Sequence, residues 1–401
     1  MNEPRPNIRV SHVITRLIVG GAQENTVSTV LGLQAGGEFD LELVSGLPEH
    51  GQGSLEAEFR GSAASLVFEP NLVRSVHPWK DARALLALRR HFRAAKPAIV
   101  HTHSGKAGIL GRWAAHLERV PLVIHGIHGP SFGPWQNSFA NALFLTAERQ
   151  ASRVTNHFMS VAEAMIRHYL RAGIGSPDKY TRIFSGFKLE PYFNASNDPA
   201  LRARYGLRPD DLVIGKIARF FKLKGHDDLF EIMPAFVQNI PQARFLLIGG
   251  GPWERRCKDF VQSRPELRGK VVFTGLVPPA EIPALCGIMD LLVHLSVREG
   301  LARALPQALA AGKPIVAYDC DGAGEVCRNG ETGFLVPLGN RPLLIEALQR
   351  LAKDAALRKN LGSNGRNFVQ ERFSVERMVS DTRELYWKLL GHPGLPTEAR
   401  R

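Results

Sequence analysis

The sequence predicts an α/β protein of two Rossmann-like, doubly wound domains that face a central cleft. Short apolar segments rich in β-branched residues alternate with helical segments along both halves of the chain. An aperiodic stretch near the middle separates the halves, and 401 residues suffice for two domains of ordinary size. No apolar run approaches the roughly 18 residues that span a bilayer, so no transmembrane helix is expected.

The first half alternates strands and helices. Its strands are expected at residues 8–14, 41–45, 98–103, 122–128 and 157–161. Its helices are expected at residues 22–33, 81–95, 106–117 and 137–151. Because a helix that connects two neighbouring strands of a sheet leaves them parallel, this alternation predicts a parallel sheet with helices on both faces.

The second half repeats this arrangement. Its strands are expected at residues 212–218, 243–248, 271–273, 291–295 and 314–317. Its helices are expected at residues 227–237, 254–262, 279–287, 303–311 and 341–351. A last helix at 375–389 has no strand after it, and we expect it to pack back on the first domain.

The boundary between the domains is expected at residues 186–199. This stretch lacks periodicity and carries Pro191 and Pro199, which is typical of a linker. The predicted segments are residues 1–186, residues 187–374 and a terminal helix segment at 375–401. Open parallel sheets bind ligands at the carboxyl ends of their strands, so we expect the site where those edges of the two domains meet.

The composition is that of a globular protein with an excess of positive charge. Apolar residues make up 44% and charged residues 22%, which excludes a disordered chain and a collagen-like fibre. There are 51 Lys and Arg against 38 Asp and Glu, a net charge of +13. Such a balance favours a polyanionic partner: nucleic acid, anionic lipid or a phosphorylated substrate.

Neither the start of the sequence nor the cysteines suggest secretion. The polar, proline-containing start at residues 1–9 has no apolar core of a signal peptide. The four cysteines include no Cys-x-x-Cys pair, so we expect buried thiols in a reducing compartment.

Two glycine runs follow expected strands. Gly20-Gly21 and Gly249-Gly250-Gly251 each lie between a strand and a helix, where backbone approaches a ligand and helix amides are free. A dinucleotide fingerprint would need a glycine where Glu254 stands, and there is no Gly-Lys-Ser/Thr of a P-loop. Nicotinamide and P-loop enzymes are therefore disfavoured, and a plain turn remains the alternative for each run.

Two further strand ends carry charged side chains. Arg219, Lys222 and Lys224 follow one strand, where they suit phosphate oxygens. Glu299 follows another, just before amides that precede an alanine-rich helix. The alternatives are a solvated basic loop for the first and a capped helix without a ligand for the second.

At these residues the sequence resembles the retaining nucleotide-sugar glycosyltransferases of the GT-B fold, glycosyltransferase family 4 type. The similarity covers about residues 8–390. The matching residues are Gly20-Gly21-Ala22-Gln23, His125 to Gly129, Arg219 with Lys224-Gly225, Gly249 to Pro252, Thr274-Gly275, Asp290, Ser296, Glu299-Gly300, Gln307 to Pro314, Gly322, Glu325, Gly330 and Gly333. Each piece alone is weak, but their order and spacing together are specific.

The resemblance implies two sets of site residues. The catalytic set is Arg219, Lys224, Glu299 and His128. The donor-binding set is Gly20, Gly21, Gly249, Gly251, Thr274, Gly275, Leu276, Gly300, Leu301, Ala302, Arg303 and Gln307. By the same resemblance, the first domain would bind the acceptor and the second the nucleotide-sugar.

The resemblance also implies a role for each group. Arg219 and Lys224 would hold the nucleotide diphosphate and, with the amides after Gly300, stabilise the charge that grows on the leaving group. Glu299 would bind hydroxyls of the donor sugar, backbone at residues 274–276 would recognise the base, and His128 would orient donor or acceptor. No cofactor or divalent metal is expected. A metal site at the neighbouring His101, His103 and His125 is disfavoured, because the family needs none. The expected donor is a UDP-sugar, with a GDP-sugar second.

Three positions depart from the family pattern. Gln307 stands where the family often has a second glutamate, which puts the usual ribose contact in doubt. Ala218 replaces the glycine before Arg219, a mild change. Gly186-Phe187-Lys188 replaces the usual Gly-Ile-Asp, so an acidic contact at the domain junction is missing.

Residues 80–112 concentrate the basic excess of the first half. Asp81 is the one acid among eight bases: Lys80, Arg83, Arg89, Arg90, Arg93, Lys96, Lys106 and Arg112. We expect this segment to dock on an anionic membrane surface, to which each base near the surface contributes about 1 kcal/mol. The alternative is an ordinary surface helix with solvated arginines.

The predicted protein is a cytoplasmic, peripherally membrane-bound glycosyltransferase. It would move a sugar with retention, by front-face attack, from a nucleotide-sugar to a lipid-linked saccharide in lipopolysaccharide, capsule or exopolysaccharide assembly. Another GT-B enzyme, such as a sugar phosphorylase or a nucleotide-sugar epimerase, is the alternative. A nucleic-acid-binding protein is the remote alternative. No nucleic-acid partner is expected, because the basic residues are not interleaved with clustered aromatic side chains.

Overall fold

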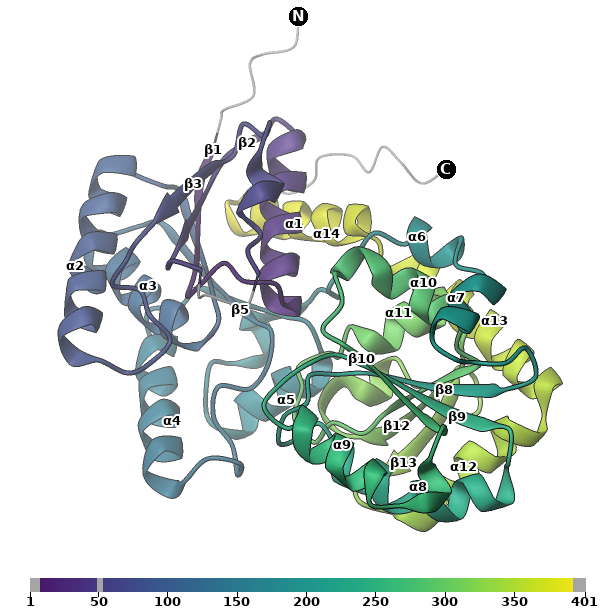
Figure 1. The fold of residues 1–401 in the computed structure, drawn as a ribbon. Coiled ribbons are helices and arrows are strands. Elements are labelled where there is room, and N and C mark those ends of the chain that lie inside the picture. Colours follow the sequence, from purple (N-terminus) through teal and green to yellow (C-terminus); the bar gives the residue numbers. More distant parts are fainter. Residues whose placement is uncertain (1–7, 49–52, 392–401) are drawn as a thin grey trace, which may run out of the picture. The chain divides into compact units, whose positions relative to one another are not determined.

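The computed structural model describes residues 8–48 and 53–391, which form two compact units (Figure 1). The first unit is Met1–Phe187 with Val375–Arg401, and the second is Lys188–Ser374. The absence of a signal peptide was predicted from residues 1–9, and residues 1–7 of that segment lie outside the described residues. No helix of the described residues is long and apolar enough to cross a membrane.

The first unit is built on a parallel sheet of order β3-β2-β1-β4-β5-β6-β7. Its strands are β1 (Ile8–Ile14), β2 (Phe39–Ser45), β3 (Ser65–Phe68), β4 (Ile99–His103), β5 (Leu122–Ile127), β6 (His157–Ser160) and β7 (Tyr180–Arg182). The register places His12 of β1 beside His101 of β4 and Ile14 beside His103. Because all neighbours are parallel, the loops after β1, β4 and β5 share one edge.

Helices cover this sheet, and the last helix of the chain is one of them. They are α1 (Gly21–Ala35), α2 (Pro78–Ala95), α3 (Gly105–Leu117), α4 (Ser138–Ser152), α5 (Glu163–Arg171) and α14 (Val375–Leu389). Figure 1 shows α14 beside α1. Gly32 of α1 is so close to Val379 of α14 that an added Cβ would lie 2.4 Å from a valine methyl. Tyr386 and Trp387 pack their rings 5.7 and 5.4 Å from that of Phe39, so α14 completes the core of the first unit.

The second unit has a parallel sheet of order β10-β9-β8-β11-β12-β13. Its strands are β8 (Leu212–Ile217), β9 (Ala243–Ile248), β10 (Val271–Gly275), β11 (Leu291–His294), β12 (Ile315–Asp319) and β13 (Gly333–Pro337). Its helices are α6 (Glu190–Phe193), α7 (Pro199–Arg204), α8 (His226–Asn239), α9 (Glu254–Gln262), α10 (Ile282–Gly287), α11 (Ala304–Ala310), α12 (Arg341–Lys353) and α13 (Ala355–Arg372). The predicted α/β class with two doubly wound domains is confirmed.

The stretch predicted as a linker is partly helical. Residues 186–199 contain α6, and Phe187, Leu189 and Tyr192 are buried. A single helical turn is too short to produce a periodic apolar pattern, so the sequence analysis did not predict it. The buried apolar side chains show that this stretch is packed against the protein and is not an exposed linker.

Candidate active site

In the second unit, the loops after β8, β9, β10 and β11 share the carboxyl edge of the sheet. They comprise residues 218–225, 249–253, 276–278 and 295–303. Except for Gln307, which lies on α11, the predicted donor-binding residues of this unit lie on these loops or at the end of β10. The fold therefore gathers them at the edge where open sheets bind ligands.

Close packing of two loops explains two glycines in the run after β9. A Cβ on Gly249 would lie 2.3 Å from the carbonyl oxygen of Ala218, and one on Gly251 would lie 2.5 Å from that of Phe220. Their φ angles of +135° and +151° also disfavour other residues. Phe220 donates its amide to Gly250 at 3.0 Å, which ties the run to the loop that carries Arg219.

The loop after β8 presents the predicted cations. Arg219 is exposed, and within the described residues it has no carboxylate partner. Its carbonyl oxygen accepts a hydrogen bond of 3.0 Å from His226 at the start of α8, if Nε2 of that ring carries the proton. Lys224 is half-buried and forms an ion pair with Glu299. The structure thus brings Lys224 and Glu299 together, whereas the guanidinium of Arg219 lies 5.9 Å from the ring centroid of Phe221 on the exposed part of the loop.

Glu299 is held from several sides. Its backbone N–H donates to Asp321 Oδ2 at 2.7 Å, and its Oε1 lies 3.9 Å from His294 Nε2. Burial alone would raise the pKa of the Glu299 carboxyl, but the Lys224 ammonium above all, with His294 and Ser296, holds that pKa below its ordinary value. Glu299 is therefore an ionised acceptor, suited to sugar hydroxyls.

Beneath this pair lie two buried bases that the sequence analysis did not single out. Burial lowers the pKa of the His294 imidazole to about 3, so this ring is neutral. Burial, and to a smaller degree the nearby Lys224, lowers the pKa of the Lys216 ammonium to about 7. Nζ of Lys216 has no hydrogen-bond partner among the described residues. The sequence analysis missed both residues because they lie inside predicted strands, Lys216 in β8 and His294 in β11. The direction of their side chains in these strands places them beneath the site.

The predicted base-recognition residues lie beside the glycine run. The hydroxyl of Thr274 donates to the carbonyl oxygen of Gly275 at 2.8 Å, and Gly249 donates its amide to the same oxygen at 3.1 Å. Leu276 follows with 76% of its surface exposed. A large apolar side chain in solvent at a sheet edge is suited to contact with a flat base.

The loop before α11 is buried more deeply than expected. Leu301 and Ala302 are only 8% and 7% exposed, and the carbonyl oxygen of Gly300 accepts the amide of Gly322 at 3.1 Å. The helix begins at Ala304, one residue later than predicted, and Arg303 accepts the amide of Gln307 at 3.1 Å. The amides of residues 301–303 thus belong to the turn before the helix, with little access to solvent.

In the first unit, Gly20, Gly21 and His128 share the carboxyl edge of the sheet. Gly20 and Gly21 connect the loop after β1 to α1, and His128 directly follows β5. A Cβ on Gly20 would meet only the tip of the flexible Gln23 side chain, so packing within the protein does not require glycine there. Half-buried His128 has its Nε2 2.9 Å from Nδ1 of His103, and burial lowers the pKa of its ring to about 4.

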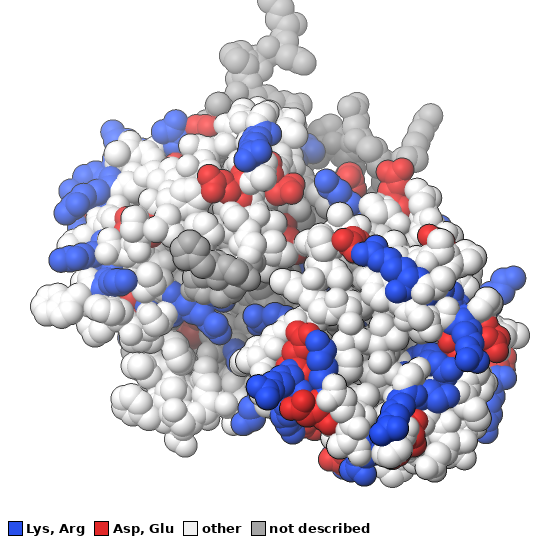
Figure 2. Space-filling model, in the orientation of Figure 1, with Lys and Arg blue, Asp and Glu red and all other residues white. Residues whose placement is uncertain are grey.

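The basic segment of residues 80–112 is a smaller surface than predicted. Arg112 was assigned to a membrane-facing patch, but its side chain is fully buried and bonds Glu148 at 2.6 Å. Lys106 is paired with Asp81, and Arg89 and Arg93 share Glu118. The remaining exposed cations of α2 are Lys80, Arg83 and Arg90. Figure 2 shows Lys and Arg side chains on the side of the first unit where α2 lies.

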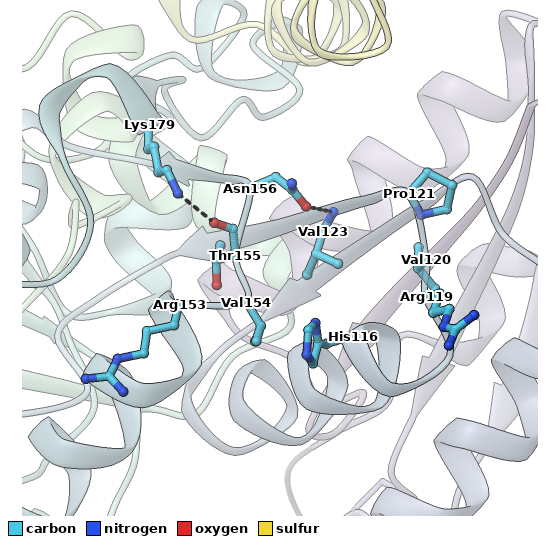
Figure 3. A pocket seen from close by; sticks show the side chains of 10 residues that line it. All are labelled: His116, Arg119, Val120, Pro121, Val123, Arg153, Val154, Thr155, Asn156 and Lys179. Atoms are coloured by element: carbon cyan, nitrogen blue, oxygen red, sulfur yellow. Dashed lines mark hydrogen bonds between the residues drawn. The ribbon is translucent and has the colours of Figure 1, made fainter.

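A separate pocket opens at the opposite edge of the first sheet (Figure 3). It has a volume of about 330 Å³ and lies between the end of α3 and the segments that lead into β5 and β6. Its lining includes His116, Arg119 and Lys179, and Nζ of Lys179 donates to the Thr155 carbonyl at 3.4 Å. His128 follows β5 and Gly20 follows β1, both at the carboxyl edge of the sheet, so this pocket at the opposite edge is not part of the candidate active site.

Comparison with known families identifies the class of protein as a glycosyltransferase. Residues 20–185 match the Glycosyl transferase 4-like domain, and residues 197–368 match the Glycosyl transferases group 1 domain. The chain belongs to the glycosyltransferases of the GT-B fold and family 4 type.

Individual relatives extend this similarity over nearly the whole chain. The chain is 26% identical over 389 residues to the UDP-Gal:alpha-D-GlcNAc-diphosphoundecaprenol alpha-1,3-galactosyltransferase of Escherichia coli, with 96% of this chain and 98% of that protein covered. It is 25% identical to the capsular polysaccharide biosynthesis glycosyltransferase CapM of Staphylococcus aureus, with 78% and 82% covered. The crystal structure of Anabaena HepE in complex with UDP has a TM-score of 0.77 at 21% identity, with 95% and 100% covered.

Proposed function

We propose that this glycosyltransferase moves a sugar from a UDP-sugar to a lipid-linked saccharide in the assembly of a bacterial cell-surface polysaccharide. Support comes from the E. coli relative, whose name specifies a UDP-sugar donor and a diphosphoundecaprenol-linked acceptor. The S. aureus relative is named for capsular polysaccharide synthesis, and the Anabaena structure holds UDP.

In the proposed reaction the bond between the sugar and the UDP diphosphate breaks, and the oxygen of the acceptor hydroxyl forms the new bond on the same face of the sugar. The hydroxyl proton passes to an oxygen of the departing diphosphate. Arg219 and Lys224 neutralise the negative charge that grows on the leaving diphosphate. Glu299 accepts hydrogen bonds from donor-sugar hydroxyls, and His128 orients the reacting sugar. Two cations supply the electrophilic assistance, so the proposed mechanism uses no divalent metal. Because the acceptor attacks the face that the diphosphate leaves, the proposed reaction retains the configuration.

The observation that carries this proposal is the ion pair between Lys224 and Glu299, with Arg219 exposed on the same loop. Loops from two neighbouring strands, β8 and β11, hold a cation and an ionised carboxylate at one point. That pairing offers a charge for a phosphate beside an acceptor for a hydroxyl, the two features that a nucleotide-sugar combines at its glycosidic bond.

Nucleotide binding tests the donor assignment. Isothermal titration of the purified protein with UDP, GDP, ADP and CMP should give the tightest binding for UDP. Arg219→Ala and Lys224→Ala should each weaken UDP binding at least tenfold, because each removes a charge-assisted contact. Arg255→Ala, at a 94% exposed side chain of α9 in the same unit, is the control and should bind UDP as the parent does. Equal binding of all four nucleotides, or unchanged binding in both site variants, would overturn the assignment.

We also propose that the outer face of α2 docks on anionic membrane. The exposed cations Lys80, Arg83 and Arg90 are accompanied by Trp79, which is 78% exposed, and by Leu86, which is 47% exposed. Aromatic side chains beside cations suit the interface of an anionic bilayer.

Vesicle co-sedimentation tests this surface. The triple variant Lys80→Glu, Arg83→Glu, Arg90→Glu should lose binding to phosphatidylglycerol-containing vesicles, and Trp79→Ser should weaken it. Arg255→Glu, at a 94% exposed side chain of α9 in the second unit, is the control. If the triple variant sediments like the control, α2 is an ordinary surface helix.

A further inference from the structure

A chain of hydrogen-bonded rings runs through the interior of the first unit and ends at His128. Tyr386 of α14 lies between two histidines, with its hydroxyl 2.7 Å from His101 Nδ1 and 3.1 Å from His12 Nε2. His12 Nδ1 lies 2.9 Å from His103 Nε2, and His103 Nδ1 lies 2.9 Å from His128 Nε2. The chain therefore connects the helix that closes the core to the candidate active site.

The register of the sheet creates this chain. His12 and His101 are neighbours across β1 and β4, and His103 is two residues further along the same face of β4. Gly126 of β5 lies beside His103, and a Cβ there would be 2.7 Å from His103 Nδ1. His125 has the opposite orientation and bonds Thr102 at 2.9 Å, so it takes no part.

All four imidazoles are neutral. His12, His101 and His103 are fully buried, and burial lowers the pKa of the His12 ring to about 3 and those of the other two well below their ordinary value. A neutral imidazole has one N–H and one bare nitrogen, so each ring that donates at one side must accept at the other. The direction of one hydrogen bond consequently sets the direction of all.

The free end of the chain selects one direction. Nε2 of His101 is buried and has no hydrogen-bond partner among the described residues. If the hydrogen bonds ran from His128 toward His101, this nitrogen would carry a buried, unpaired N–H, whereas in the opposite direction it carries only a bare lone pair. Buried unpaired N–H groups are rarer than buried unpaired acceptors, so the second direction is favoured.

We propose that this chain acts as a positioning device that fixes the tautomer of His128. Tyr386 accepts from His101 and donates to His12, which donates to His103, which donates from Nδ1 to Nε2 of His128. The proton of His128 is then on Nδ1. In the proposed transferase reaction, on which this consequence rests, His128 donates from Nδ1 to an oxygen of the sugar and cannot serve as an acceptor at that atom.

A bound metal ion is the competing explanation of the cluster. His12, His101 and His103 each offer a nitrogen, and these nitrogens lie within 4.8 Å of one another. His12 and His103, however, place the facing nitrogens 2.9 Å apart, which is a hydrogen-bond distance. A metal would need bare lone pairs from both rings directed at one point.

Nitrogen NMR of the protein with ¹⁵N-labelled histidine rings tests the proposal without any turnover. The signal of His128, identified by its loss in His128→Gln, should show a protonated Nδ1 and a bare Nε2. A protonated Nε2 on His128 would overturn the proposal. A change in the ring signals of His12, His101 and His103 on adding one equivalent of Zn²⁺ would also overturn it, because that outcome identifies the cluster as a metal site.

Two nearly isosteric variants then separate positioning from packing. His103→Asn keeps an N–H near the position of Nδ1, whereas His103→Leu offers none. We expect His103→Asn to retain the Nδ1–H form of His128 and His103→Leu to give a mixture of tautomers. With a working transferase assay, kcat should fall at least tenfold in His103→Leu and be largely restored in His103→Asn.

Tyr180→Phe is a control outside the ring chain, since half-buried Tyr180 donates to the Ile174 carbonyl. It should leave the His128 signal unchanged. Equal His128 spectra in the Leu and Asn variants would overturn the role of His103. If the tautomer is as proposed but no sugar transfer occurs with any donor, the proposed function fails and the positioning of His128 stands.

Discussion

Removing Arg112 should destabilise the first unit severely, because it leaves a carboxylate in the interior without its counter-ion. Both side chains of the Arg112–Glu148 pair are 0% exposed, and the pair is 2.6 Å long. Arg112 also donates to the Gly108 carbonyl at 2.8 Å, and Glu148 accepts from Ser131 at 3.1 Å. The pair therefore anchors α3 and α4 to the loop that follows His128.

The size of the effect follows from the burial of both charges. Breaking a fully buried ion pair by removing one partner costs about 3–5 kcal/mol, whereas replacing both partners by apolar residues is often close to neutral. For a unit of about 200 residues, a cost of this size lowers the melting temperature by roughly 6–20 °C. We thus expect this loss in Arg112→Met and a much smaller one in Arg112→Met with Glu148→Leu.

Tryptophan fluorescence during thermal unfolding measures this effect. Four of the five tryptophans belong to the first unit: Trp79, Trp113, Trp135 and Trp387. Arg93→Met, which removes an exposed partner of Glu118, is the control and should change the melting temperature little. A small decrease in the melting temperature of Arg112→Met, or equal decreases in the single and the double variant, would refute the reasoning. Arg112 would then contribute to stability no more than an exposed charge.

Three further predictions concern pH and close packing. In the folded state the pKa of His12 is lowered to about 3 and that of His128 to about 4, so below pH 6.5 the unfolded chain binds more protons than the folded protein. The urea midpoint of unfolding should therefore fall as the pH is lowered from 6.5 toward 4. A midpoint that does not change with pH would contradict the burial of these rings. Lys216→Met should raise the melting temperature at pH 7, since the folded state lowers the ammonium pKa from 10.5 to about 7, and this gain should shrink toward pH 10; a gain that does not change with pH would argue against a buried amine. Gly225→Ala should weaken UDP binding, because its φ is +63° and the added Cβ would lie 2.0 Å from the Leu295 carbonyl oxygen; titration calorimetry that shows parent affinity would exclude this constraint.

Local patterns predicted most of the alternating fold but missed β3, β7, β13, α5 and α13. The strand at 243–248 and the helix at 254–262 have the predicted bounds, because their apolar side chains follow the period of the element. Helix α13 was missed because Gly362 and Gly365 lower helix propensity. Those glycines permit close contact with the Gly312 carbonyl and Leu309, which no local pattern reveals. The three-residue β7 is too short to show alternation.

The candidate site was partly accessible from sequence for a similar reason. Arg219 and Glu299 lie in the loops that follow β8 and β11, so a parallel sheet brings them to one edge. The ring chain that reaches His128 depends on the pairing of β1 with β4, a long-range register that no local pattern contains. The basic segment was overestimated because Glu118 and Glu148, which pair with its arginines, lie outside it in the sequence.

Acceptor-dependent release of UDP is the most direct test of the central claim. The full-length protein is supplied with a panel of UDP-sugars and a polyprenyl-diphosphate-linked saccharide in vesicles, with EDTA present. We expect one donor to yield UDP and an elongated lipid product only when the acceptor is present. Arg219→Ala and Lys224→Ala should each lose activity at least a hundredfold, and Arg255→Ala, at an exposed side chain of α9, should keep parent activity. Release of no UDP from any donor, or full activity in both site variants, would contradict the account.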